Sequence, residues 1–177
     1  MDDRFFSLPE QLCRDHNTRD PFKIASDLGY DVSFINTKKQ KGMCRYIMKN
    51  YFIWINQNMS EQMQRMTCAH ELGHILFHKP LLASHDLLVE MEIFDIRNST
   101  EYEANLFAAN LLIDDRELMD FLRSGYDIVS AASTLNVNVN LLAIKLVEMQ
   151  NNDPKIRVPF IPSPTFLGRI GDRADSM

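Results

Sequence analysis

The sequence predicts an α+β fold, in which a small antiparallel sheet packs on a helical bundle. Three segments rich in β-branched and aromatic residues follow one another, at residues 31–36, 43–49 and 51–56, and such segments are typical of strands. From about residue 58 onward, apolar residues recur every three or four positions instead, which indicates helices. The chain has 177 residues, 45% of them hydrophobic, which suits one compact domain with a sizeable core.

Turn and cap residues define the elements before and within the sheet. Two helical pieces are expected within residues 7–28, with Pro9 near the start of the first. Asp20-Pro21 supplies an N-cap and a first-turn proline for the second, which Gly29 ends. The Lys49-Asn50 pair is suited to a tight hairpin turn between the last two strands.

Five helices are expected after the sheet. The first begins near Asn58 or Ser60 and is stopped by Pro80. The other four are expected at about 100–113, 116–123, 127–134 and 138–149. Residues 81–99 form a connection whose apolar side chains we expect to pack on the body of the domain.

The expected organisation is one domain over residues 1–150, followed by a tail. The last two helices form a C-terminal helical hairpin at 127–149. From Asn151 onward, four prolines and little periodicity predict a Pro-rich extended tail over 151–177.

The composition limits which binding partners and which cell compartment we expect for this protein. A net charge of −5 and a pI near 5.5 give no general attraction to phosphate backbones or anionic membrane surfaces, which disfavours direct nucleic-acid binding. No run of about twenty apolar residues occurs, and the acidic start of the chain lacks the basic residues of a secretory leader. Cys13, Cys44 and Cys68 form no CxxC pair, which suits reduced thiols. We therefore expect a soluble cytoplasmic protein with no membrane partner.

The motif His70-Glu71-Leu72-Gly73-His74 lies in a stretch patterned as a helix. Residues four apart on a helix project from nearly the same face, so His70 and His74 can direct ring nitrogens at one metal ion. Glu71 is rotated by about 100° from His70. That offset places its carboxylate beside the metal, where it can take a proton from an activated water molecule. The motif therefore predicts a zinc-dependent hydrolase with Glu71 as the catalytic base.

Two histidines are insufficient, because catalytic zinc usually takes three protein ligands and leaves one position open. The metzincin arrangement is excluded, because it requires a histidine at position 80, which Pro80 occupies. His78 is one turn beyond His74, too far along a straight helix to complete the same site. We expect His78 instead to favour the C-terminal end of the helix dipole.

Glu101 is the preferred third ligand, at the start of the next helix. Asn105 shares a helical face with Glu101 and can bond the far ring nitrogen of a ligating histidine, which would fix that ring. Small Ala104 and Ala108 permit close approach of the two helices. Glu103 stays open as the alternative ligand.

Two blocks together resemble the ImmA/IrrE family of zinc metallopeptidases, and the resemblance covers roughly residues 20 to 150. They are His70-Glu71-Leu72-Gly73-His74-Ile75-Leu76-Phe77-His78 and Glu101-Tyr102-Glu103-Ala104-Asn105-Leu106-Phe107-Ala108-Ala109-Asn110-Leu111-Leu112. The family often has Met-Pro after the two leucines, where this chain has Ile113-Asp114. This departure concerns the loop more than the chemistry.

The resemblance implies a minimal thermolysin-like (gluzincin, zincin) metallopeptidase fold. It implies Zn²⁺ as the cofactor, with His70, His74 and Glu101 as ligands, Glu71 as base, and Asn105 holding a ligand histidine. It also implies limited endoproteolysis of a protein substrate, a DNA-binding repressor of the helix-turn-helix kind from a phage, a mobile element or a stress regulon.

Other features leave alternatives open. A strand edge from Met43 to Met48 could hold an extended substrate by β-augmentation, and an extra electrophilic donor could come from Tyr102, Tyr126 or His85. A noncatalytic regulator that binds a protein partner or DNA is the competing function. Residues 127 to 147 have a helix-turn-helix-like apolar rhythm, but Lys145 is their only basic residue. Recognition helices need several basic phosphate contacts, so packing or protein docking is the preferred interpretation.

Overall fold

The structure is a computed structural model that describes residues 3–83, 99–153 and 156. It confirms the α+β class, with a small sheet among helices. The chain forms two compact units, Met1–Leu112 and Ile113–Met177. The candidate site lies in the first unit, and each unit is described by itself below.

The sheet has three strands in the order β1-β3-β2. They are β1 (Asp31–Ile35), β2 (Gly42–Ile47) and β3 (Asn50–Asn56). β2 pairs antiparallel with β3, as a hairpin must, whereas β1 pairs parallel with β3. The sheet is therefore mixed, whereas the sequence predicted a purely antiparallel sheet. Ile53 and Ile55 of β3 are fully buried, and burial of this apolar strand places it at the centre, between the two strands that precede it.

The turn of the β2–β3 hairpin lies one residue earlier than predicted. Met48 and Lys49 both have positive φ, 51° and 67°, which is the backbone conformation of a two-residue turn that matches the twist of paired strands. Met48 is 93% exposed. The predicted turn pair included Asn50, which instead begins β3.

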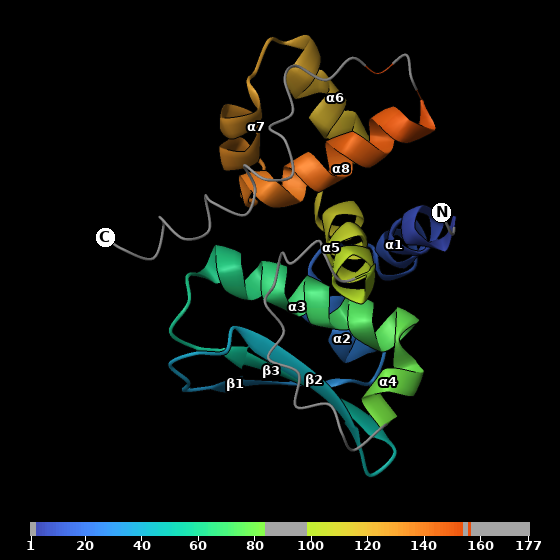
Figure 1. Cartoon of the computed structure of the whole chain (residues 1–177), viewed down its shortest axis with the longest axis vertical. Helices are drawn as coiled ribbons and strands as arrows, with labels where there is room; N and C mark the ends of the chain where they lie inside the picture. Colours follow the sequence, from blue (N-terminus) through green and yellow to red (C-terminus); the bar gives the residue numbers. More distant parts are fainter. Residues whose placement is uncertain (1–2, 84–98, 154–155, 157–177) are drawn as a thin grey trace. The chain divides into compact units, whose positions relative to one another are not determined.

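The first unit contains five helices within its described residues. They are α1 (Arg4–His16), α2 (Pro21–Asp27), α3 (Glu61–Phe77), α4 (Lys79–Ala83) and α5 (Ser99–Leu112). α3 lies between the sheet and α5, so one of its faces packs on β2 and β3 and another on α5 (Figure 1). Pro80 does not end the helical run completely, because a short helix resumes at Lys79 with the proline in its first turn.

α1 begins at Arg4, so Pro9 lies inside it rather than near its start as predicted. Proline has no N–H, and its ring therefore leaves the carbonyl of Phe5, four residues earlier, without its helical partner. Asn110 of α5 donates its side-chain amide to that carbonyl at 3.1 Å. An interior proline is accommodated here because a second helix supplies the missing hydrogen bond.

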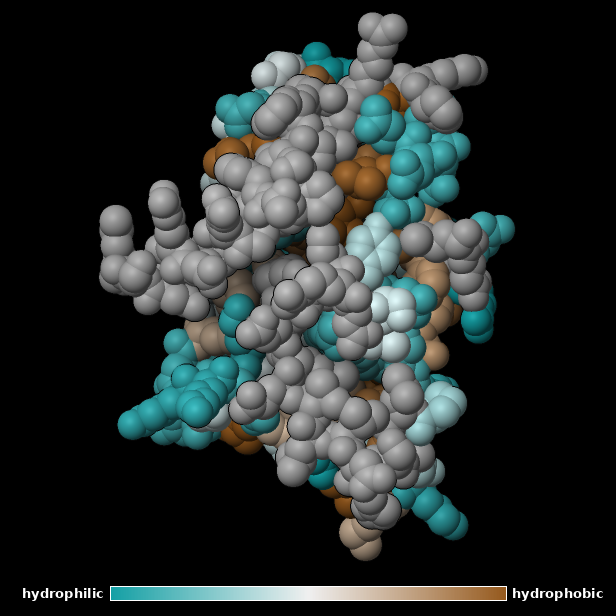
Figure 2. All heavy atoms as spheres, viewed as in Figure 1, coloured by the Kyte–Doolittle hydropathy of each residue, from teal (hydrophilic) through white to brown (hydrophobic). Residues whose placement is uncertain are grey.

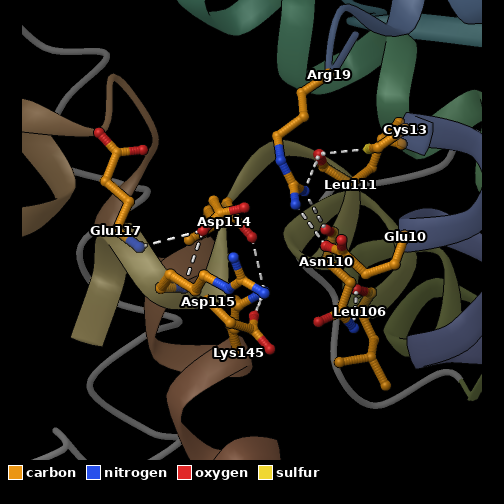
Figure 3. Close-up of polar contacts among 12 residues, drawn as sticks. Glu10, Cys13, Arg19, Leu106, Asn110, Leu111, Asp114, Asp115, Glu117 and Lys145 are labelled. Atoms are coloured by element: carbon orange, nitrogen blue, oxygen red, sulfur yellow. Dashed lines mark hydrogen bonds and ion pairs between the residues drawn. The ribbon is translucent and has the colours of Figure 1, made fainter. Parts of the chain in front are cut away.

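The C-terminal end of α5 is held by two residues from the first helices and their connection (Figure 3). The Arg19 guanidinium donates to the carbonyls of Asn110 and Leu111 at 3.1 and 3.0 Å, and it pairs with Glu10. The Cys13 thiol also donates to the Leu111 carbonyl. Terminal helix carbonyls need such partners, and these contacts fix the helix that carries Glu101 near its other end.

The surface of the first unit is polar where the loops at the end of the sheet lie. Residues 36–41 and 57–60 connect the strands and α3, and hydrophilic side chains gather there, on the left in Figure 2. The Asn56 amide donates to the carbonyls of Thr37 and Gln40, both at 3.0 Å, which ties one loop to the end of β3.

The second unit contains α6 (Asp115–Arg123), α7 (Ile128–Thr134) and α8 (Val139–Asn152). Side chains at Asp114, Asp127 and Asn138 cap them by accepting backbone N–H groups. α8 continues past the predicted end at 149, and nearly all of the expected tail over 151–177 lies outside the described residues.

Lys145 is 1% exposed, donates to the Ile113 carbonyl at 2.8 Å and pairs with Asp115 (Figure 3). Its charge is therefore used inside the unit and is not presented to a phosphate backbone.

Within the described residues, no single helix is both long and apolar enough to cross a membrane. α7 and α8 reach those limits only as a pair, which bends by 112°.

Candidate metal centre

Three buried side chains from two helices converge in the first unit. His70 and His74 come from α3, and Glu101 comes from the first turn of α5. The two Nε2 atoms are 3.0 Å apart. The Glu101 carboxylate oxygens lie 3.2 Å from His70 Nε2 and 3.4 Å from His74 Nε2. All three residues are 4% exposed or less, so the cluster is enclosed by protein.

Gly73 allows the two helices to approach closely enough for this. A Cβ atom at Gly73 would lie 3.1 Å from the Cα of Ala104 and 3.1 Å from a ring carbon of Phe107. These distances are tighter than normal packing, so a side chain at Gly73 would push α5 away from α3. The glycine between the two histidines therefore brings Glu101 within reach of both rings.

The His70 ring is oriented by the residue that the sequence predicted for such a role. His70 Nδ1 lies 2.9 Å from the Asn105 side-chain oxygen. An amide oxygen can only accept, so Nδ1 carries the proton and Nε2 keeps its lone pair. That lone pair faces Glu101 and His74, which is the orientation that a metal ligand needs.

The His74 ring has a different outer partner, and sequence analysis missed it. His74 Nδ1 lies 3.1 Å from His78 Nδ1, and His78 Nε2 lies 2.9 Å from a Glu103 carboxylate oxygen. The sequence predicts a helix-dipole role for His78 and a possible ligand role for Glu103. The structure places Glu101 rather than Glu103 beside the histidine pair, and it connects Glu103 to His78. His74 and His78 are four residues apart, and side chains at this spacing are neighbours on a helix surface. This spacing was the signal in the sequence for their contact.

Burial and mutual contact set the charges of the cluster. The pKa of His74 is lowered to about 4, chiefly by burial and also by the neighbouring rings of His70 and His78, against the opposing effect of Glu101. Burial raises the pKa of Glu101, but its contacts with His70 and His74 outweigh this and bring the pKa down to about 2. At neutral pH the cluster therefore offers a neutral His74 imidazole and a carboxylate, the protonation states that bind a metal.

These residues fit a metal ion. The Glu101 oxygens accept no well-aligned hydrogen bond within the described residues, although they are buried against imidazole nitrogens. An imidazole lone pair and a carboxylate that face each other at 3.2 Å call for a cation between them. Ligand atoms about 2.0–2.1 Å from a tetrahedral zinc ion lie about 3.3 Å apart, and the three observed separations bracket that value. No other group of this kind is found among the described residues.

Glu71 lies next to the cluster and against β2. It is fully buried, and burial raises its pKa. A Cβ atom at Gly42 would lie 3.1 Å from the Glu71 carboxylate and 2.4 Å from the Thr67 methyl group. The Cys44 thiol, two residues along the same face of β2, also lies beside the Glu71 carboxylate, and burial and then this carboxylate raise the pKa of the thiol.

Sequence analysis also missed Gly42 and Cys44, and it left other residues undecided. Two small residues at a spacing of two on a strand indicate one closely covered face, but the strand had been predicted to begin after Gly42. Tyr102 is half-buried on α5, and the exposed Tyr126 belongs to the second unit. His85 lies outside the described residues.

Known proteins resemble this chain in the same region. A peptidase family described as the IrrE N-terminal-like domain matches residues 25–147, which include the cluster and Glu71. The chain is 28% identical over 144 residues to uncharacterized immunity region protein 2 of Bacillus phage phi105, covering 80% of this chain and 89% of that protein. It is 36% identical over 72 residues to the metallopeptidase ImmA of Bacillus subtilis strain 168, covering 41% of this chain and 40% of ImmA.

Proposed function

Because the chain belongs to the ImmA/IrrE family of metallopeptidases, we propose that it is a zinc-dependent endopeptidase that makes limited cuts in a partner protein. The observation that supports this best is the enclosed group of His70, His74 and Glu101 with the Glu71 carboxylate beside it. A site that only stabilised the fold would need no additional buried carboxylate at that place.

In this proposal, His70, His74 and Glu101 hold the metal, and Glu71 handles the protons. Zinc held there would supply a Lewis acid for the peptide carbonyl and would make a water molecule more acidic. The Glu71 carboxylate takes a proton from the attacking water and later gives it to the leaving amine. Burial supports this role because it raises the pKa of Glu71 toward the range in which a carboxylate both accepts and returns a proton.

The edge of β2 is the proposed binding site for the substrate. Among the described strands, β2 pairs only with β3, so we propose that backbone groups along its other edge bind an added strand. Gly42, at the start of β2, lies close to the Glu71 carboxylate. An extended peptide bound along this edge would therefore pass next to the proposed base.

We propose a DNA-binding repressor with a helix-turn-helix fold as the substrate class, cut in the cytoplasm. One relative is named for a phage immunity region and another is named as the metallopeptidase ImmA, and the first of these is matched over most of its length. Limited cleavage of a repressor would be a suitable activity for a small peptidase from such a region.

The test compares metal content with cleavage in two variants. Purified parent protein, Glu71→Gln and His74→Ala are analysed for zinc and then incubated with candidate repressors from the same genome, and fragments are identified by mass spectrometry. We expect the parent to contain zinc and to make discrete, chelator-sensitive cuts. Glu71→Gln should retain zinc without cutting, because the amide cannot accept the proton, and His74→Ala should lose both.

The alternative is a noncatalytic regulator that binds a protein partner. Stable binding of a repressor by the zinc-loaded parent, with no cuts under any condition, would favour that alternative over the peptidase. Cleavage by Glu71→Gln at the parental rate would show that Glu71 is not the base.

A further inference from the structure

His78 connects the proposed metal centre to a carboxylate on the neighbouring helix. It is the C-cap residue of α3 and is 7% exposed. One ring nitrogen, Nδ1, lies 3.1 Å from Nδ1 of His74, and the other, Nε2, lies 2.9 Å from a Glu103 oxygen. Both nitrogens of His78 are therefore engaged, on opposite sides of the ring.

The chemistry of the groups determines which one is the donor and which one is the acceptor in each contact. A carboxylate oxygen only accepts, so His78 donates from Nε2 to Glu103. In this tautomer Nδ1 of His78 has a lone pair and accepts a hydrogen bond from the N–H at Nδ1 of His74. The remaining nitrogen of His74, Nε2, then keeps its lone pair, and this is the atom that faces His70 and Glu101.

We propose that His78 and Glu103 are positioning residues that act in series to orient His74 toward the metal. The inference rests on the metal centre of the proposed function. It assigns α5 a role for each ligand histidine, because Asn105 holds His70 directly and Glu103 holds His74 through His78. The link that ends in a carboxylate also makes its imidazole more basic than the link that ends in an amide.

Purely structural roles for the two residues would have a different signature. A histidine at a helix C-terminus and a glutamate in a first turn both stabilise their helices through the dipole, but neither effect requires them to contact each other or to change the affinity for zinc. Zinc affinity, measured separately from stability, therefore distinguishes positioning from helix stabilisation.

The experiment measures zinc dissociation constants by competition with a chromophoric chelator. The set comprises the full-length parent, Glu103→Gln, His78→Leu, the double variant and Glu61→Gln as control. Glu61 is an exposed glutamate in the first turn of α3, so its substitution makes the same chemical change without touching His78. We expect each single variant to weaken zinc binding about 10- to 100-fold, and Glu61→Gln to bind like the parent.

The double variant tests whether the two residues act in series. If Glu103 acts through His78, removing both weakens zinc binding no more than His78→Leu alone. Thermal unfolding of the metal-free variants checks the fold, and if His78→Leu does not fold, Glu103→Gln decides alone, because its side chain is 35% exposed.

Parental affinity in both single variants overturns the inference and leaves the metal centre intact. If the effects of the two single substitutions on the free energy of zinc binding add fully in the double variant, the serial link is also overturned. Failure of the parent to bind zinc contradicts the proposed function itself, so the two failures are distinguishable.

Discussion

At the scale of single residues, two glutamates on the same helix contact different neighbours, and the packing of that helix determines which glutamate contacts which neighbour. Glu101 and Glu103 are two apart on α5, and they therefore face directions about 200° apart around the helix. The pattern of one helix was sufficient to place His70, Glu71 and His74. It could not decide between the two glutamates, because the rotation of α5 about its axis is set by packing against α3.

Gly42 offers a residue-scale prediction. Its Cβ would lie 2.4 Å from the Thr67 methyl group and 3.1 Å from the Glu71 carboxylate, so Gly42→Ala must shift β2 or α3. We expect a loss of stability of about 1–3 kcal/mol, measured by urea unfolding, and slower cleavage at unchanged zinc content, because the atoms nearest the added methyl group belong to Thr67, Glu71 and Trp54 and not to a proposed ligand.

Gly29→Ala is the matched control for this prediction. Gly29 has a φ of +80° and nothing near its missing Cβ, so alanine there strains the backbone away from the site. The control should lose stability but keep its cleavage rate per folded molecule. Equal effects of both substitutions on the cleavage rate would contradict the placement of Gly42 against Glu71.

At the scale of elements, local sequence patterns predicted which helices and strands form better than they predicted how these elements are arranged. The helices α5, α6 and α7 lie within one residue of their predicted bounds, because caps and apolar periodicity are local properties. The parallel pairing of β1 with β3 was not predictable in this way, because strand order follows from which strand is buried. The proline inside α1 likewise depends on an amide from α5.

The contact of α3 with α5 yields a prediction for Gly73→Ala. Alanine is better than glycine in a helix by about 1 kcal/mol, but its methyl group would lie 3.1 Å from backbone and ring atoms of α5. Overpacking costs about 1–3 kcal/mol, so we expect net destabilisation. Zinc affinity should also fall, because α5 carries Glu101. A variant that is more stable than the parent and binds zinc equally well would rule out the close approach.

At the scale of the whole molecule, the metal should stabilise the fold. Zinc that binds the folded chain and not the unfolded chain adds RT ln(1 + [L]/Kd) to the free energy of unfolding. We expect 1,10-phenanthroline to lower the thermal midpoint of the parent and excess zinc to restore it. Glu101→Gln, which lacks the charged ligand, should show a much smaller dependence on chelator in the same calorimetric scans.

The buried His74 gives the metal-free protein a pH dependence. Its pKa is about 4 in the folded chain and near 6.5 when unfolded, so between these values the unfolded chain binds more protons. The free energy of unfolding therefore falls as the pH falls, by about 2 kcal/mol from pH 7 to pH 5 for this group. Urea unfolding in chelator at both pH values should show a dependence smaller by that amount in His74→Gln. An unchanged dependence would mean that His74 titrates normally.

The most direct test of the account is X-ray diffraction from zinc-loaded crystals, with anomalous difference maps calculated above and below the zinc edge. We predict one strong peak per chain, at bonding distance from Nε2 of His70, Nε2 of His74 and the Glu101 carboxylate, with Glu103 bonded to His78 instead. A peak that lies away from these three side chains, or none at all in crystals grown with excess zinc, would contradict the metal centre on which the proposed activity depends.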